Sequence, residues 1–471
     1  MRISASASSR ARRIAAFAGP FLVASGPVAA HTSSQSLVML LPTGVYTIAG
    51  LAVVVLTVLM LAVPGLGRRL TRLPHRALFA APAFGLATVT SLLSTLLLLF
   101  AVIAGFTGSR DPLTNPMPLL IWTIWWIGIV FVHTVLGNLW HWINPWTGLH
   151  RLIMGSREEG LVRLPGWLGH WLAIAGFFLF SCFMLAHPAP EDPAILARIV
   201  AIYWLVSFVG AVVFGRADWF GRCEFVTVML RLYSHISPFG LRDGAFHVGF
   251  PGWKLAYLEK PTVSLALLTL MLLATSSFDG FNETFVWLVI LGLNPLEFPG
   301  RSGVVGQTVA GIVTFNLALF AVFFACVWIG LAWIRQTGRT VETFCRMSAT
   351  ILPIAGGYHI AHYLTVFLVN AQYTLSAVSD PFGTGKDYLG LGTYYVTTGF
   401  FNTRDSVMVI YLTLAGAVVV GHVVSILAAH VQMLRSVGDE RKVMRSQAAM
   451  VAFMIAYTFF GLWLLAAPRG A

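Results

Sequence analysis

Two histidines three residues apart are the best candidates for chemistry in this chain of 471 residues. His359 and His362 lie in the middle of a long apolar run, where an ionisable side chain is costly and is a functional candidate. Residues three apart on a helix differ by about 60° in direction and ~4.5 Å in height, so both rings can reach one ion. The pair predicts a divalent metal site. The alternative is two rings that are hydrogen-bonded to neighbouring helices.

A third ligand and a carboxylate would complete such a site. His422 and His133 also lie inside apolar runs, and we take His422 as the third ligand. Asp279, at the end of another apolar run, is the candidate for a supporting carboxylate or a general base. Bis-histidine haem ligation between the runs that contain His359 and His422 is a competing use of the same residues.

The composition shows what kind of element must carry these residues. Hydrophobic residues make up 57% of the chain and charged residues 10%, with 34 Phe and 15 Trp. Soluble proteins carry about 25% charged residues. The sequence therefore predicts an all-α polytopic membrane protein and argues against a soluble enzyme, a disordered protein or a nucleic-acid-binding domain. Four Cys without a CxxC spacing predict neither a disulfide framework nor a cysteine zinc site.

Ten apolar runs are long enough to cross a membrane as helices. A shorter run at 285–293 predicts a re-entrant or interfacial segment. The ten predicted spans are 44–63, 80–106, 118–137, 166–186, 195–215, 261–280, 305–334, 347–370, 406–430 and 447–467.

The basic residues alternate with these spans. The connections at 64–79, 138–165, 216–260, 335–346 and 431–446 carry 20 of the 30 Lys and Arg, whereas the opposite connections and the C-terminus carry five. This asymmetry predicts that the basic connections are cytoplasmic. It also accounts for the net charge of +12 without a nucleic-acid partner.

The first thirty residues have the pattern of a secretory signal peptide. A basic stretch precedes a short apolar one, and Val28-Ala29-Ala30 supplies small residues for cleavage. We therefore expect residues 31–471 to form a single bundle in the bacterial inner membrane, with both mature termini outside. Cleavage after Ala30 would place the α-amine and the imidazole of His31 on one residue, a pair that can chelate a late first-row metal.

One residue and eight segments carry a resemblance to a known family. They are His31, Leu139–Trp146, Arg216–Arg222, Leu230–Phe239, Gly249–Lys254, Phe278–Gly280, Gly292–Arg301, Tyr358–Tyr363 and Gly421–His430. In this order and combination, over about residues 31 to 435, the chain resembles the bacterial integral-membrane family of fenitrothion hydrolases. The resemblance implies hydrolysis of an organophosphorus triester or thiophosphotriester with release of a nitrophenol. It assigns no catalytic residue.

Such a reaction suits an apolar small-molecule substrate that partitions into the lipid bilayer, and a metal bound by neutral imidazoles would activate the water. Two other functions remain open at this point, a haem- or copper-binding membrane module and a small-molecule transporter. The sequence also leaves open whether a second, similar membrane subunit takes part.

Overall fold

The computed structural model describes residues 41–63, 65–80, 85–155, 158–258, 261–297, 300–392 and 394–468. The predicted signal peptide and His31 lie outside these residues. Within them, ten helices are long and apolar enough to cross a membrane, which confirms an all-α multi-pass membrane protein.

The observed helices follow the predicted spans closely, because about twenty consecutive apolar residues favour a membrane-spanning helix wherever they occur. The long helices are α3 (Thr43–Ala62), α5 (Gly85–Thr107), a continuous helix made of α6 (Pro116–Pro118), η1 (Leu119–Ile129) and α7 (Val130–Val135), α10 (Trp171–Ala186), α11 (Pro193–Phe214), α14 (Val263–Asn282), α16 (Val305–Trp333), α18 (Leu352–Ser379), α19 (Arg404–Val437) and α20 (Glu440–Ala466).

Shorter elements connect them. These are α4 (Leu66–Leu70), α8 (Trp140–Ile143), α9 (Thr147–Met154), η2 (Gly166–Leu168), α12 (Arg216–Asp218), η3 (Trp219–Cys223), α13 (Phe225–Ser234), η4 (Trp253–Tyr257), α15 (Phe285–Ile290), η5 (Arg301–Gly303), η6 (Thr337–Arg339), α17 (Thr340–Ser348), η7 (Ala349–Ile351) and η8 (Gly399–Phe401). The run at 285–293 thus forms a helix of six residues, α15, which is too short to span.

A small antiparallel sheet corrects one predicted boundary. Strand β1 (His75–Ala80) pairs with β3 (Ala245–Gly249), which also pairs with β2 (Phe239–Arg242). Ala80, which we predicted to begin the second span, is the last residue of β1, and the helix begins at Gly85. The backbone of His75–Ala80 makes hydrogen bonds to a distant strand, and this pairing overrides the apolar composition of the segment.

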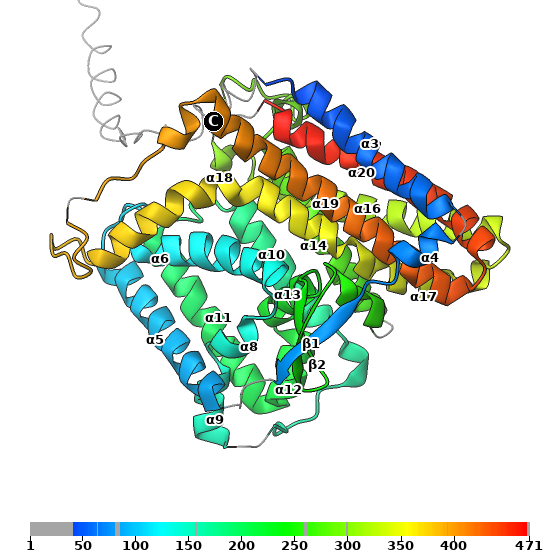
Figure 1. The fold of residues 1–471 in the computed structure, drawn as a ribbon. Coiled ribbons are helices and arrows are strands. Elements are labelled where there is room, and N and C mark those ends of the chain that lie inside the picture. Colours follow the sequence, from blue (N-terminus) through cyan, green and yellow to red (C-terminus); the bar gives the residue numbers. More distant parts are fainter. Residues whose placement is uncertain are drawn as a thin grey trace, which may run out of the picture.

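The long helices form two groups that are visible in Figure 1. Helices α3, α16, α19 and α20 lie side by side, whereas α5 and α11 pack together on the other side. The groups meet where α18 packs on η1 and where α10 packs on α14 and α16.

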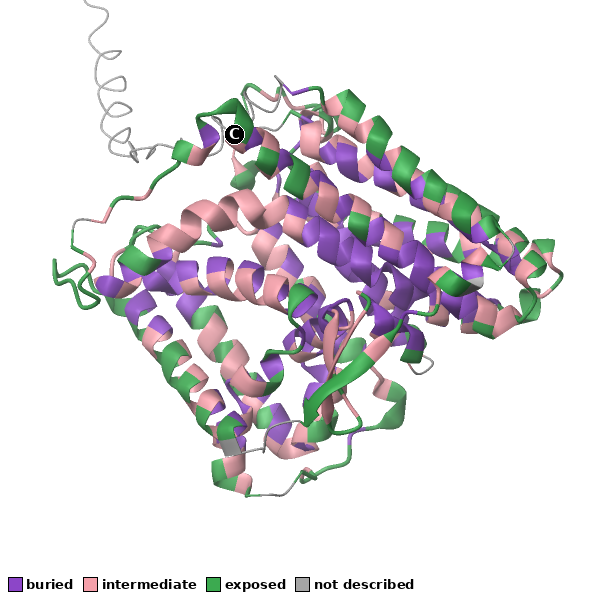
Figure 2. Cartoon of the chain, viewed as in Figure 1, coloured by how far each residue is buried: buried purple, intermediate pink, exposed green. Residues whose placement is uncertain are grey.

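Burial distinguishes the inner helices from the outer ones. In the most apolar stretch of α14, 78% of the residues are buried, against 17% in α5. Figure 2 shows α3 and α5 exposed along much of their length. Helix α14 is therefore enclosed by protein, and α3 and α5 present apolar side chains outward, as lipid-facing helices do.

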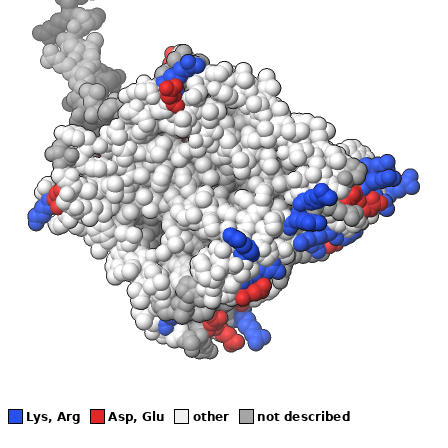
Figure 3. Space-filling view, viewed as in Figure 1, with Lys and Arg blue, Asp and Glu red and all other residues white. Residues whose placement is uncertain are grey.

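Charged side chains gather at the margins of the molecule, and a broad uncharged surface separates them in Figure 3. This is the surface expected of a protein whose middle contacts hydrocarbon.

Candidate metal centre

Helix α14 presents two carboxylates at its C-terminal end. It begins at the cap Thr262, whose side chain accepts a hydrogen bond from the Leu265 amide, and it ends at Asn282. Asp279 lies in the last turn and Glu283, the C-cap residue, follows four residues later. Residues four apart share one helix face, so both carboxylates point to the same side.

This end of α14 is electrostatically unfavourable for anions. A helix C-terminus carries partial negative charge from its unpaired carbonyls, which favours a cation there and disfavours carboxylates. The last turn of α14, described in full, contains no basic side chain. The local charge is therefore of the sign that a bound cation would balance.

Helix α18 brings an imidazole to the same place. His362 Nε2 lies 3.2 Å from Asp279 Oδ2, with 12% of the His362 side chain and 8% of the Asp279 side chain exposed. The hydroxyl of Tyr363, the next residue, donates a hydrogen bond to the same carboxylate oxygen. The buried carboxylate is thus held from two directions by α18.

The position of α18 depends on close packing against α19. A Cβ atom added to Gly357 would lie 2.4 Å from the Ala417 carbonyl oxygen, and one added to Gly421 would lie 2.5 Å from the Pro353 carbonyl oxygen. Both distances are impossible for real contacts, so a glycine is required at each position for the helices to approach this closely.

Asp279, Glu283 and His362 together form the candidate metal centre. One ligand atom from each lies within 4.8 Å of the others, and among the described residues no other set of three His, Cys, Asp or Glu side chains does so. Asp279 is buried, His362 partly buried and Glu283 exposed, so the group opens to the surface. Two carboxylates and one imidazole suit a divalent ion such as Zn²⁺ or Mn²⁺ and leave positions for water.

The structure therefore brings together two of the predicted site residues, Asp279 and His362. It places His359 elsewhere. The Nε2–H of His359 donates to the Trp126 carbonyl at 3.0 Å, and the ring packs against Trp126. Because α18 lies between α14 and η1, the rotation of about 60° between the two histidines turns one ring to each neighbour.

His422 is also apart from this group. Its Nδ1–H donates to the Val418 carbonyl of its own helix at 2.9 Å. Nδ1 of His359 and Nε2 of His422 are buried and find no hydrogen-bond partner among the described residues. His133 uses both ring nitrogens, as donor to the Ile129 carbonyl and acceptor from the Trp140 amide, which leaves neither for a metal.

Two contributors to this arrangement, Glu283 and Tyr363, were not predicted from the sequence. Glu283 could have been found from its spacing of four residues after Asp279, which places both on one face of a helix end. Tyr363 gives no such signal, because a tyrosine in an apolar run is ordinary.

A scan of protein-family models, a search of curated proteins and a search of solved structures each found no match to this chain.

Proposed function

We propose that this chain is a membrane-embedded hydrolase that cleaves apolar phosphotriesters or thiophosphotriesters, such as fenitrothion, with a divalent metal held by Asp279 and His362 beside Glu283. The observation that carries the proposal is the convergence of these three side chains at the C-terminal end of α14. The substrate class comes from the resemblance to the fenitrothion hydrolases.

The geometry suggests a role for each residue. Asp279 and His362, whose ligand atoms are 3.2 Å apart, would hold the metal, and the Tyr363 hydroxyl would orient Asp279. Asp279 is thus better suited to ligate the ion than to act as a general base. Glu283 is the exposed member, so it would meet the incoming water.

The reaction needs an activated water and a good leaving group. A bound divalent ion would lower the pKa of its water to about 7 and would draw negative charge from the phosphoryl oxygen or sulfur. Water oxygen would form the new bond to phosphorus, the bond to the aryl oxygen would break, and nitrophenolate would leave with the bonding pair. Glu283 would receive the proton of the water.

The placement of the site supports this function. The residues 216–260 that precede α14 carry six Lys or Arg and are predicted to be cytoplasmic, so the opposite end of α14 would face outside. A bacterial inner-membrane protein with this orientation would meet its substrate on the outer side, where water reaches Glu283.

The test is release of nitrophenol from fenitrothion by the purified full-length chain in lipid nanodiscs. We expect activity to disappear after chelation and to return when one divalent metal is restored. His362→Ala should lose most of the activity and the bound metal, whereas His359→Ala should keep the metal. Equal metal loss in both variants would instead support the His359–His362 pair predicted from the sequence.

The alternative functions predict different results. A haem protein would show a Soret absorption band that His359→Ala or His422→Ala removes. A transporter would move substrate across vesicles without releasing nitrophenol. Either result, without chelator-sensitive hydrolysis, would replace the present proposal.

A further inference from the structure

A second feature lies on the other side of Trp126. A cavity of about 370 Å³ is bounded by α5, η1, α10 and α11, with α8 and α13 at one end. Its volume is in the range of small-molecule sites. The Phe180 ring, in the cavity wall, lies 4.8 Å from the Trp126 ring, which in turn lies 6.2 Å from the Tyr363 ring. The cavity and the candidate metal centre are thus separate.

The wall of the cavity offers almost no polar group. None of the described residues that line it carries a charge. The hydroxyl of Tyr203 donates to Glu224 and is therefore already used. Four tryptophans in the wall donate their indole N–H groups to acceptors of the protein itself. The donations run from Trp122 to the Pro190 carbonyl, from Trp140 to the Thr227 hydroxyl, from Trp146 to the Trp204 carbonyl, and from Trp204 to the Pro145 carbonyl. These tryptophans present ring faces and no free donor.

The cavity opens on the apolar perimeter of the molecule. Leu97, Leu179 and Ile199 line it from three different helices, and they are also 50%, 68% and 39% exposed. In a membrane-spanning region such exposed side chains meet lipid tails. An occupant would therefore enter from the hydrocarbon.

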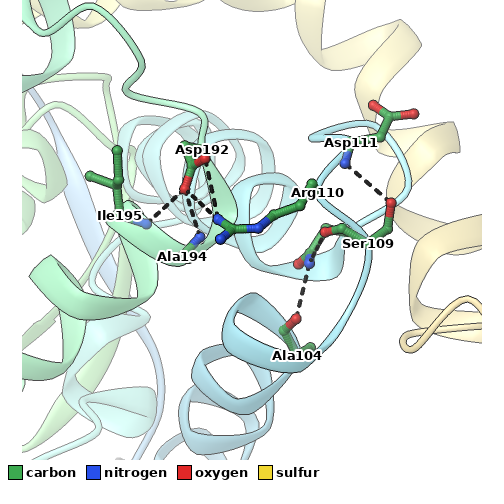
Figure 4. Close-up of polar contacts among 8 residues, drawn as sticks. Ala104, Ser109, Arg110, Asp111, Asp192, Ala194 and Ile195 are labelled. Carbon is green, nitrogen blue, oxygen red and sulfur yellow. Dashed lines mark hydrogen bonds and ion pairs between the residues drawn. The ribbon is translucent and has the colours of Figure 1, made fainter.

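Polar contacts fix the helices around the cavity at both ends. At one end Arg110, in the turn after α5, pairs with Asp192 at 3.2 Å, and Asp192 also caps α11 through the Ala194 and Ile195 amides (Figure 4). At the other end the Thr90 hydroxyl, in the second turn of α5, donates to the Trp142 carbonyl of α8 at 2.6 Å. Because α5 is tied at both ends, the space beside it exists before any ligand binds.

We propose that this cavity binds one uncharged, apolar small molecule drawn from the bilayer, with aromatic or alkyl groups packed against Trp125 and Phe180. A charged or zwitterionic group would find no partner in the wall, so the cavity excludes a lipid headgroup and admits only uncharged, apolar groups. Aromatic rings in contact add stabilisation beyond the burial of their area, which favours an aryl ligand. The inference does not depend on the hydrolytic function, because it concerns binding alone.

The probe is 3-trifluoromethyl-3-phenyldiazirine, a neutral photoreactive aryl compound, applied to the full-length chain in nanodiscs. Labelling of Trp125 and Phe180, mapped by mass spectrometry, should saturate, whereas labelling of lipid-facing α3, which does not line the cavity, should rise in proportion to the probe. Excess bromobenzene should suppress the saturable labelling, and the anion benzoate should not.

Val200→Phe provides the matched test, because Val200 of α11 lines the cavity. A larger side chain there should reduce the saturable labelling about tenfold, since overpacking removes the space for the probe. The control is Val206→Phe on the same helix, at a position that is 57% exposed and does not line the cavity. The saturable labelling of Val206→Phe should equal that of the wild type.

Two outcomes would overturn the inference. Labelling of Trp125 and Phe180 that never saturates would show ordinary lipid-facing surfaces, and equal labelling of folded Val200→Phe and Val206→Phe would show that the space is not used. If Val200→Phe does not fold, competition by bromobenzene against the wild type still decides. Loss of nitrophenol release with saturable labelling intact would reject the hydrolase and leave this site standing.

Discussion

The contact between α14 and α18 and the cavity beside η1 lie on opposite sides of Trp126 and have opposite chemistry. At the first, a buried carboxylate is met by an imidazole and a hydroxyl. At the second, the lining residues carry no charge, and four of the five lining tryptophans donate their indole N–H groups to protein acceptors. The contrast shows how one bundle can suit both an ion and a neutral ligand. A buried charge requires partners at hydrogen-bond distance, and tightly packed helices supply them. Where the helices are farther apart and their facing side chains are apolar, a charged ligand would find no partner, so the space suits only apolar groups.

Removing the charge of Asp279 should produce the largest effect. In Asp279→Asn we expect metal affinity to fall by at least about a hundredfold, the upper end of the loss caused by groups that only support a ligand. Zn²⁺ or Mn²⁺ should raise the melting temperature of the wild type, because a ligand of the native state stabilises it, and should not raise that of the variant.

The control for that experiment is Asp380→Asn. Asp380 lies in the loop after α18 and accepts hydrogen bonds from the Thr384 and Gly385 amides. Its replacement should leave the metal-dependent shift intact. A shift retained in Asp279→Asn but lost in Asp380→Asn would move the metal out of the α14–α18 contact.

The tight packing beside the metal centre can be tested at two glycines of α19. Gly421→Ala should lower the free energy of unfolding by about 1–3 kcal/mol, because the new methyl group would overlap the Pro353 carbonyl. Gly416→Ala on the same helix meets no atom within 4 Å and should be neutral or slightly stabilising. Equal melting temperatures of the two variants would mean that α18 and α19 are not packed as closely as the structure has them.

Tyr363→Phe should have a smaller effect, since it removes one hydrogen bond to Asp279 without changing the ligands. We expect about a tenfold loss of metal affinity, as for other groups that orient a ligand. Tyr457→Phe is the matched control. It breaks a hydrogen bond to Ser277 on the same helix, α14, and leaves Asp279 untouched. If the two variants bind metal equally well, Tyr363 does not position the carboxylate.

The smallest effect, a change in how stability depends on pH, is expected from Glu224, which lies beyond the wall of the cavity. Burial raises the pKa of its carboxyl, which also accepts hydrogen bonds from Tyr203 and from the amides that begin α13. The folded state therefore keeps a proton at a pH where the unfolded carboxyl, with a pKa of about 4.3, has released it. Stability should fall as pH rises through this window.

Glu224→Gln cannot titrate and should flatten that slope. The measurement is the melting temperature of both proteins from mildly acidic to neutral pH. An unchanged slope in the variant would assign the pH dependence to other groups.

The spans could be predicted from the sequence because a run of apolar residues is a local property. The boundary at Ala80 could not, since it depends on pairing of His75–Ala80 with Ala245–Gly249, far along the chain. Local composition carries no information about a strand partner.

The candidate site was predictable in part for the same reason. Asp279 and His362 are visible as polar residues in apolar runs, and both runs are predicted to start from a cytoplasmic connection and to cross the membrane in the same direction. The predicted topology thus places both residues toward the outer side, but it does not show that the two helices are neighbours. The direction of each ring is not visible, because the neighbour of each face of α18 is decided by tertiary packing. That rotation separates His359 from His362. The cavity is less predictable still, because it depends on the spacing between the four helices α5, η1, α10 and α11.

The small sheet has a consequence for how the protein is made. Strand β1 ends at Ala80, and its partner β3 ends at Gly249. Bacterial and other ribosomes add about 5–20 residues per second, so the first strand waits roughly 10–30 s for its partner to emerge. During synthesis the segment before α5 must remain unpaired while the next helices insert. The N-terminal part of the nascent chain is therefore completed only when the middle of the protein has been translated.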